Sequence, residues 1–190
     1  MADLTPHQRP INDERLHQAL AGTIIVWAKA VRRIYRQIVI RDREVFPRIL
    51  LLEDHIMLAH LLVLGLRQIA EHLEKMKRVR PGYRTQRFSN AARAFLREYQ
   101  QEDIRTCRHL LEHHADHLMG RGKYQDAVEE IDLYMLALQG TRQDDEQTIA
   151  FSIGIFGRGY QMDRIVRCVD ELLAAFDDPG PQQADIIESA

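Results

Sequence analysis

The stretch ILLLEDHIMLAHLLVLGL, residues 49–66, is the most apolar part of the 190-residue chain and decides its fold. On a helix, these residues are apolar almost all the way round, which is typical of a helix buried on every side. Pro47 fits the first helical turn, where its missing backbone donor is not needed. The pattern predicts a central, buried helix over residues 47–77. Its longest apolar run, residues 56–66, is too short to cross a membrane.

Two more long amphipathic helices are predicted on either side of it. Before the central helix, apolar residues recur at three- and four-residue steps from Leu16 to Ile38, which predicts a helix over 13–40 with Asn12 or Asp13 as its cap. The segment RDREVFP, residues 41–47, is expected to end it. After the central helix, the pattern predicts a helix over 90–119, capped by Ser89 or Asn90 and ended by Gly120. Its core stripe is Phe95, Ile104, Cys107, Leu111, His114 and Leu118.

The last third of the chain has a different periodicity. QTIAFSIGI, residues 147–155, alternates apolar with small or polar residues, which predicts a half-buried strand. Residues 128–138 are interpreted as a second strand, joined to the first by a hairpin loop over 140–147, and FGRGY, residues 156–160, as a turn. Asp163 is expected to cap a final helix. The side chains expected to face inward on that helix are Ile165, Cys168, Val169 and Leu172.

Together these elements predict a mainly α protein. It is a bundle of three long helices with a closing helix and a small antiparallel β element near residues 130–161. Residues 12–176 form one helical domain, and 1–11 and 177–190 are flexible tails. The start, MADLTPHQRP, has no apolar leader. Both cysteines, Cys107 and Cys168, fall on apolar stripes and are expected to be buried, reduced thiols, so a cytoplasmic location is predicted.

Charge is divided unevenly along the chain. Residues 124–190 carry 14 acidic against 4 basic side chains, whereas the first 123 residues carry 22 basic against 14 acidic. The segment KMKRVRPGYRTQRF, residues 75–88, has no acid and carries two aromatic side chains. Such a segment can hold single-stranded nucleic acid through phosphate contacts and base stacking. It can also be a solvated connector that contacts the acidic half of the chain or of a partner. The candidate RNA-binding residues are Lys75, Lys77, Arg78, Arg80, Arg84 and Arg87.

Four of the nine histidines lie within CRHLLEHHADHLMGRGK, residues 107–123. On a helix, His109, His113 and His117 follow one another along one edge, and His114 lies on the core stripe. Arg108 and Glu112 are four residues apart and can form an ion pair. This edge of the helix is therefore either a charged, solvated surface or a functional site.

The stretch RHLLEH, residues 108–113, resembles the Arg-polar-x-x-x-His motif of the HEPN superfamily. That resemblance implies a helical bundle, commonly dimeric, related to metal-independent endoribonucleases of toxin–antitoxin or phage-defence systems. In that interpretation Arg108 contacts the scissile phosphate and His113 acts as general acid or base. The implied partners are RNA, a second copy of the chain, and an antitoxin or other protein; no cofactor and no membrane are implied.

Two other classes of function stay open. A pair of histidines four residues apart, such as His113 and His117, can chelate one metal ion. A third ligand could come from His60, His55 or Glu53, and three histidines in a helical bundle resemble the DinB-like metal-binding family. A helical protein-interaction module without chemistry is the third class. No phosphate-binding glycine loop, dinucleotide turn or serine-nucleophile motif is present in the sequence.

Overall fold

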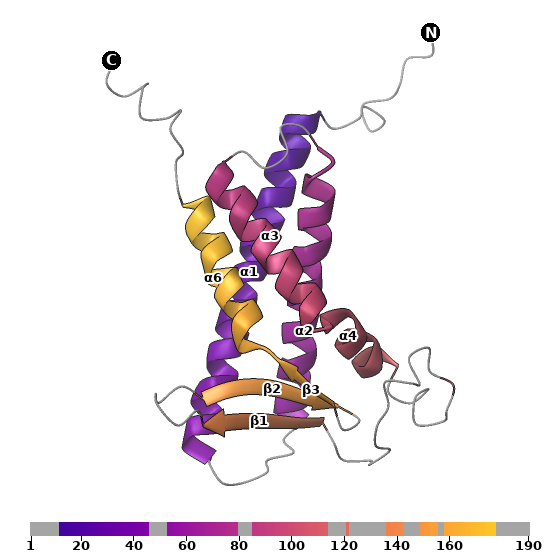
Figure 1. Cartoon of the computed structure of the whole chain (residues 1–190), viewed down its shortest axis with the longest axis vertical. Coiled ribbons are helices and arrows are strands. Elements are labelled where there is room, and N and C mark those ends of the chain that lie inside the picture. Colours follow the sequence, from indigo (N-terminus) through magenta and orange to yellow (C-terminus); the bar gives the residue numbers. More distant parts are fainter. Residues whose placement is uncertain are drawn as a thin grey trace.

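The computed structural model describes residues 12–45, 53–79, 85–113, 121, 136–142, 149–155 and 158–177. Five helices and three strands lie within these ranges (Figure 1), and mainly α is confirmed as the fold class. The helices are α1 (Asp13–Val45), α2 (Glu53–Met76), α3 (Gln86–Gln101), α4 (Ile104–Glu112) and α6 (Asp163–Phe176), and the strands are β1 (Leu136–Arg142), β2 (Ile149–Ile155) and β3 (Arg158–Gln161).

The core lies between the long helices. α1 packs against α2 along one side and against α6 along the other, and α3 crosses in front of them against α6 (Figure 1). The expected inward side chains of α6 are all buried, and so are Phe95, Ile104, Cys107 and Leu111 of the predicted third-helix stripe. The apolar periodicity therefore correctly identified which faces of these helices meet.

The second helix is less enclosed than its composition suggests. Its inner face is fully buried at Leu62, Leu66 and Leu73, as expected. On its outer face, however, Met57 is 55% exposed and Leu61 is 38% exposed. Among the elements that the structure describes, α1, α3 and α4 are the main ones that pack against α2, and they leave this outer face exposed.

The close approach of α1 and α2 depends on a glycine. A Cβ atom at Gly65 would lie 2.6 Å from Cγ2 of Val31, whereas a Cβ atom at Gly22, on α1, would meet nothing within 4 Å. Val31 is fully buried, so it has little room to move. The absence of a side chain at residue 65 is therefore what lets the two helices pack this closely.

We expect Gly65→Ala and Gly22→Ala to change stability in opposite directions. Gly65→Ala overpacks the interface and should lower the free energy of unfolding by about 1–3 kcal/mol. Gly22→Ala should raise it by about 0.5–1 kcal/mol, since alanine is the better helix former in open space. Urea unfolding followed by circular dichroism measures both. A stabilised Gly65→Ala variant would show that the two helices are farther apart than described.

The predicted third helix is two helices. Asp103 adopts a left-handed conformation with φ 48° and separates α3 from α4. A continuous helix cannot contain such a residue, so the chain changes direction there. The Asp103 carboxylate accepts a hydrogen bond from the Thr106 hydroxyl at 2.7 Å, and this bond stabilises the first turn of α4. Prediction of one helix over 90–119 was wrong because the apolar stripe continues across the break.

Several helix ends also differ from prediction. α1 continues through residues 41–45, because RDREV contains neither glycine nor proline. α3 begins earlier than expected: its cap is Thr85, whose hydroxyl accepts from the Phe88 amide at 3.1 Å, rather than Ser89 or Asn90. Asn12 caps α1 as predicted, with its side-chain oxygen 2.8 Å from the Arg15 amide.

A three-stranded antiparallel sheet in the order β1-β2-β3 lies at the end of the bundle where α6 begins (Figure 1). The predicted strand over 149–155 is confirmed as β2, and Leu136–Leu138 of the second predicted strand belong to β1. FGRGY is not simply a turn, because Arg158–Gln161 forms β3 and pairs with β2 from Ser152↔Gln161 to Ile155↔Arg158. Ile153, buried in β2, joins the sheet to the helical core.

Asp163 does not cap α6 as predicted. It is the first residue of the helix, and the cap position is Met162. Its carboxylate instead accepts a hydrogen bond from the hydroxyl of Tyr35, across the α1–α6 interface. Burial, followed by this hydrogen bond and the negative charge of Asp163, raises the pKa of Tyr35 above its usual value. The tyrosine therefore stays protonated and ties the two helices together.

Some predictions fall outside the described residues. They concern Pro47, His114, His117, Gly120, most of the second predicted strand and hairpin loop, and the two tails. Both cysteines are buried free thiols, and burial raises the pKa of Cys168 to about 11. None of the described helices is apolar over a length sufficient to cross a bilayer.

Candidate nucleic-acid interface

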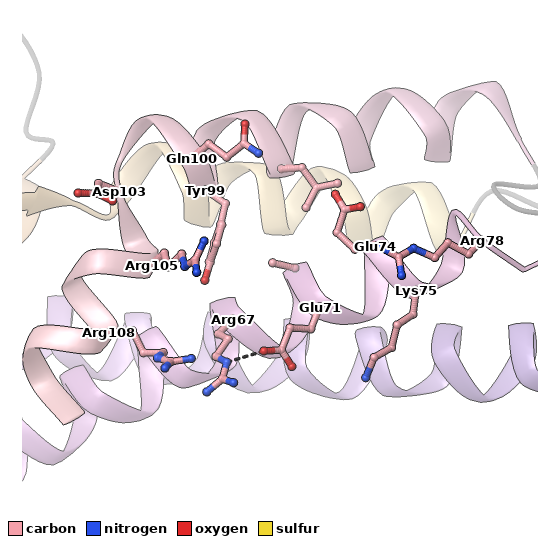
Figure 2. A pocket seen from close by; sticks show the side chains of 12 residues that line it. Arg67, Glu71, Glu74, Lys75, Arg78, Tyr99, Gln100, Asp103, Arg105 and Arg108 are labelled. Carbon is pink, nitrogen blue, oxygen red and sulfur yellow. Dashed lines mark hydrogen bonds and ion pairs between the residues drawn. The ribbon is translucent and has the colours of Figure 1, made fainter. Parts of the chain in front are cut away.

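A groove runs between α2, α3 and α4, and basic side chains dominate its polar lining (Figure 2). We call it the α2–α4 groove; its volume is about 690 Å³. Its lining residues are Arg67, Ala70, Glu71, Glu74, Lys75 and Arg78 from α2 and its end, Leu96, Tyr99 and Gln100 from α3, and Asp103, Arg105 and Arg108 from the start of α4. Five of these side chains are cationic and three are acidic, so the groove is positive overall.

Three arginines gather at one end of the groove. Arg67 comes from the middle of α2, and Arg105 and Arg108 come from successive turns of α4. The break at Asp103 is what makes this possible, because it turns α4 toward α2 instead of letting it continue along α3. We call this set of three the arginine end; Lys75 and Arg78 lie toward the opposite end (Figure 2).

Carboxylates hold two of these guanidinium groups in place. Nε of Arg67 lies 2.5 Å from Glu71, and its Nη1 lies 3.7 Å from Glu112. Glu112 also accepts from Nη2 of Arg108 at 2.9 Å. Glu112 thus bridges α2 and α4, as the predicted Arg108–Glu112 pair allows. These pairs are partly exposed and contribute little stability, about 0–1 kcal/mol each, but they orient the guanidinium groups.

Arg108 retains an unused donor. Its side chain is only 23% exposed, and its Nε atom is buried with no hydrogen-bond partner among the described residues. A buried donor without an acceptor costs about 1–3 kcal/mol.

Tyr99 adds a neutral donor beside the arginines. Burial raises the pKa of its hydroxyl, while the positive charges of Arg108 and Arg67 act in the opposite direction. The hydroxyl therefore stays protonated at neutral pH. Its ring stacks on buried Phe95, with centroids 6.2 Å apart, so its position is set by the core.

The predicted RNA-binding residues are only partly gathered in this groove. Lys75 and Arg78 line it, whereas Lys77 pairs with Glu74 at 2.7 Å. Arg87 is exposed in the first turn of α3 and does not line it. Arg80 and Arg84 lie outside the described residues.

The two predicted catalytic residues lie on α4 but in different surroundings. Arg108 lines the groove, and His113, the residue that ends α4, does not. The His113 side chain is exposed, and its ring packs against that of His109 with centroids 4.5 Å apart. Within one chain, the groove therefore contains Arg108, the predicted phosphate contact, but not His113, the predicted general acid or base.

Of the residues predicted for the alternative metal site, His113 and His60 are described by the structure, and His117 lies outside the described residues. His60 is half-buried on α2. Across the described ranges, no three histidine, cysteine or carboxylate side chains come together in a way that could hold a metal ion.

Three residues of the groove were not predicted from the sequence. They are Arg67 and Arg105 of the arginine end, and Tyr99 beside it. Arg67 and Arg105 fall within the predicted helices 47–77 and 90–119 and belong to no motif in the sequence. Nothing in the linear sequence brings α2 and α4 together, because that contact depends on the left-handed turn at Asp103.

Fold and groove define the class: a mainly α-helical protein with a cationic groove where three helices meet. Comparison with known protein families, curated proteins and solved structures gives no match to this chain.

Proposed function

We propose that this protein binds single-stranded RNA, with the strand's phosphates in the α2–α4 groove. The observation that supports this most is the arginine end. Three guanidinium groups and the protonated hydroxyl of Tyr99 meet there, from three different helices. Guanidinium groups match phosphate oxygens in geometry and charge.

The groove is also long enough for more than one phosphate. Lys75 and Arg78 continue the positive lining away from the arginine end. Both belong to the basic segment predicted from the sequence, and Arg108 belongs to the HEPN-like motif. The proposal is therefore a HEPN-like, RNA-associated protein of a cytoplasmic toxin or phage-defence system. The exposed side chains of Met57 and Leu61 favour a homodimer through α2.

RNA binding is tested by fluorescence anisotropy with a labelled single-stranded RNA at several salt concentrations. We expect binding that weakens with salt, with a slope of log K against log salt of roughly −2 to −3.5, for three to five neutralised phosphates. Absence of binding at low salt would contradict the proposal and favour an interaction module. Equal binding in EDTA would argue against a bridging metal.

Cleavage is a second proposal, which the HEPN-like resemblance implies. The observation in its favour is the exposed His113 imidazole, five residues beyond Arg108 on the same chain segment. Histidine is the side chain most often used for general acid–base catalysis. RNA should be cut in EDTA by the unaltered protein, and His113→Ala should bind RNA without cutting it. If both proteins leave the RNA intact, the cleavage proposal is wrong, and the proposal of RNA binding is unaffected.

A further inference from the structure

A second groove lies between α1 and α6 and shares no lining residue with the first. We call it the α1–α6 groove; its volume is about 720 Å³. Its lining residues are Ile25, Lys29, Arg32, Arg33, Arg36 and Gln37 from α1, and Leu173, Phe176 and Asp177 from the end of α6. It is therefore both cationic and apolar.

The cations follow one side of α1. Lys29, Arg32 and Arg36 are three or four residues apart, so they lie on one face of the helix, with Arg33 beside them. Arg32 has a partner, Asp170, at 3.6 Å. Among the residues that the structure describes, no carboxylate lies within ion-pair distance of the other three. Most of this positive charge is available to a ligand.

The apolar side chains lie at one end of the groove. Contacts of Arg32 with Asp170 and of Tyr35 with Asp163 show that α1 and α6 run antiparallel. Ile25 therefore lies beside the C-terminal end of α6, near Phe176. The ring of Phe176 packs on that of Phe88, with centroids 4.5 Å apart, which fixes its position. From Ile25 to Gln37, α1 is about 18 Å long.

We propose that the α1–α6 groove binds a free nucleoside polyphosphate. Arg33 and Arg36, with Lys29 and Arg32, bind the chain of phosphates, because several cations in a row suit several linked anionic groups. The base lies at the apolar end against Ile25 and Phe176, as aromatic rings prefer. Asp177, at that end, can accept a hydrogen bond from an amino group of the base or a hydroxyl of the ribose.

This two-part lining argues for a nucleotide over a simple anion, which would use only the cations. The separation of the two grooves argues for a free ligand over the RNA strand, because the strand is proposed to lie against α2, α3 and α4. The inference is independent of the proposed RNA binding.

The test is isothermal titration calorimetry of the full chain with ATP, inorganic tripolyphosphate and adenosine, each without divalent metal. We expect ATP to bind at least about tenfold more tightly than tripolyphosphate or adenosine, since both parts of the groove contribute. Arg33→Ala/Arg36→Ala should weaken ATP binding at least about tenfold. Arg15→Ala/Arg93→Ala, with the same loss of charge on exposed positions of α1 and α3, should bind ATP like the unaltered protein.

Several results would overturn the inference. Absence of heat with ATP up to millimolar concentration is one, and tripolyphosphate binding as tightly as ATP is another, because the base would then contribute nothing. Equal weakening by the control pair would show general attraction to charge. RNA that displaces ATP, and that itself binds less tightly to Arg33→Ala/Arg36→Ala, would assign the groove to the strand instead. Circular dichroism confirms that each variant is folded.

Discussion

Phe95→Ala is expected to lower the free energy of unfolding by about 3–5 kcal/mol, the largest stability effect predicted for this protein. Among the residues that the structure describes, Phe95 is the largest side chain that is fully buried. It lies on α3, which packs against both α6 and α2, so its removal leaves a cavity where three helices meet. Close packing prevents the helices from collapsing fully into that space. Urea unfolding, followed by circular dichroism, measures the loss.

Two matched variants make this result specific. Phe95→Leu keeps most of the apolar volume and should cost less than about 1.5 kcal/mol. Val26→Ala removes an apolar side chain that is 66% exposed, and should change stability by less than about 0.5 kcal/mol. If Phe95→Ala cost no more than Val26→Ala, α3 would not be packed into the core as described.

Arg105→Ala/Arg108→Ala should weaken RNA binding about ten- to a hundredfold, equivalent to about 1.4–2.8 kcal/mol. Both guanidinium groups belong to the arginine end of the α2–α4 groove. Loss of two phosphate contacts should reduce the salt slope by about 1.4, at about 0.7 for each phosphate on a single strand. Anisotropy titrations at several salt concentrations measure both quantities.

The control is Arg15→Ala/Arg164→Ala. It removes the same charge from exposed positions on α1 and α6 that do not line the α2–α4 groove. We expect its affinity to change less than twofold and its salt slope to stay the same. If both pairs weakened binding equally, RNA would be attracted by the general charge of the chain, and the arginine end would have no special part in binding.

The sequence predicted most of the architecture because the spacing of apolar residues along the chain indicates which face of a helix or strand is buried. The predicted inward side chains of α6 are buried, and so are Phe95 on α3 and Ile104, Cys107 and Leu111 on α4. The stripe on α1 is buried or partly buried along its length, and Ile149–Ile155 is a strand. Less of the groove could be predicted. Lys75, Arg78 and Arg108 were identified by charge or motif, whereas Arg67, Tyr99 and Arg105 looked like ordinary surface positions.

Local sequence by itself determined that this is a mainly α chain, which residues face the core, and where its positive charge is concentrated, since neighbouring residues decide all three. Only the tertiary structure decided that α4 turns back toward α2 at Asp103, that Val31 packs directly against Gly65, and that three arginines meet beside Tyr99. The physical reason is that each of these depends on contacts between residues far apart in the chain. A left-handed residue, a missing Cβ atom or a bridging carboxylate leaves no periodic pattern in the sequence.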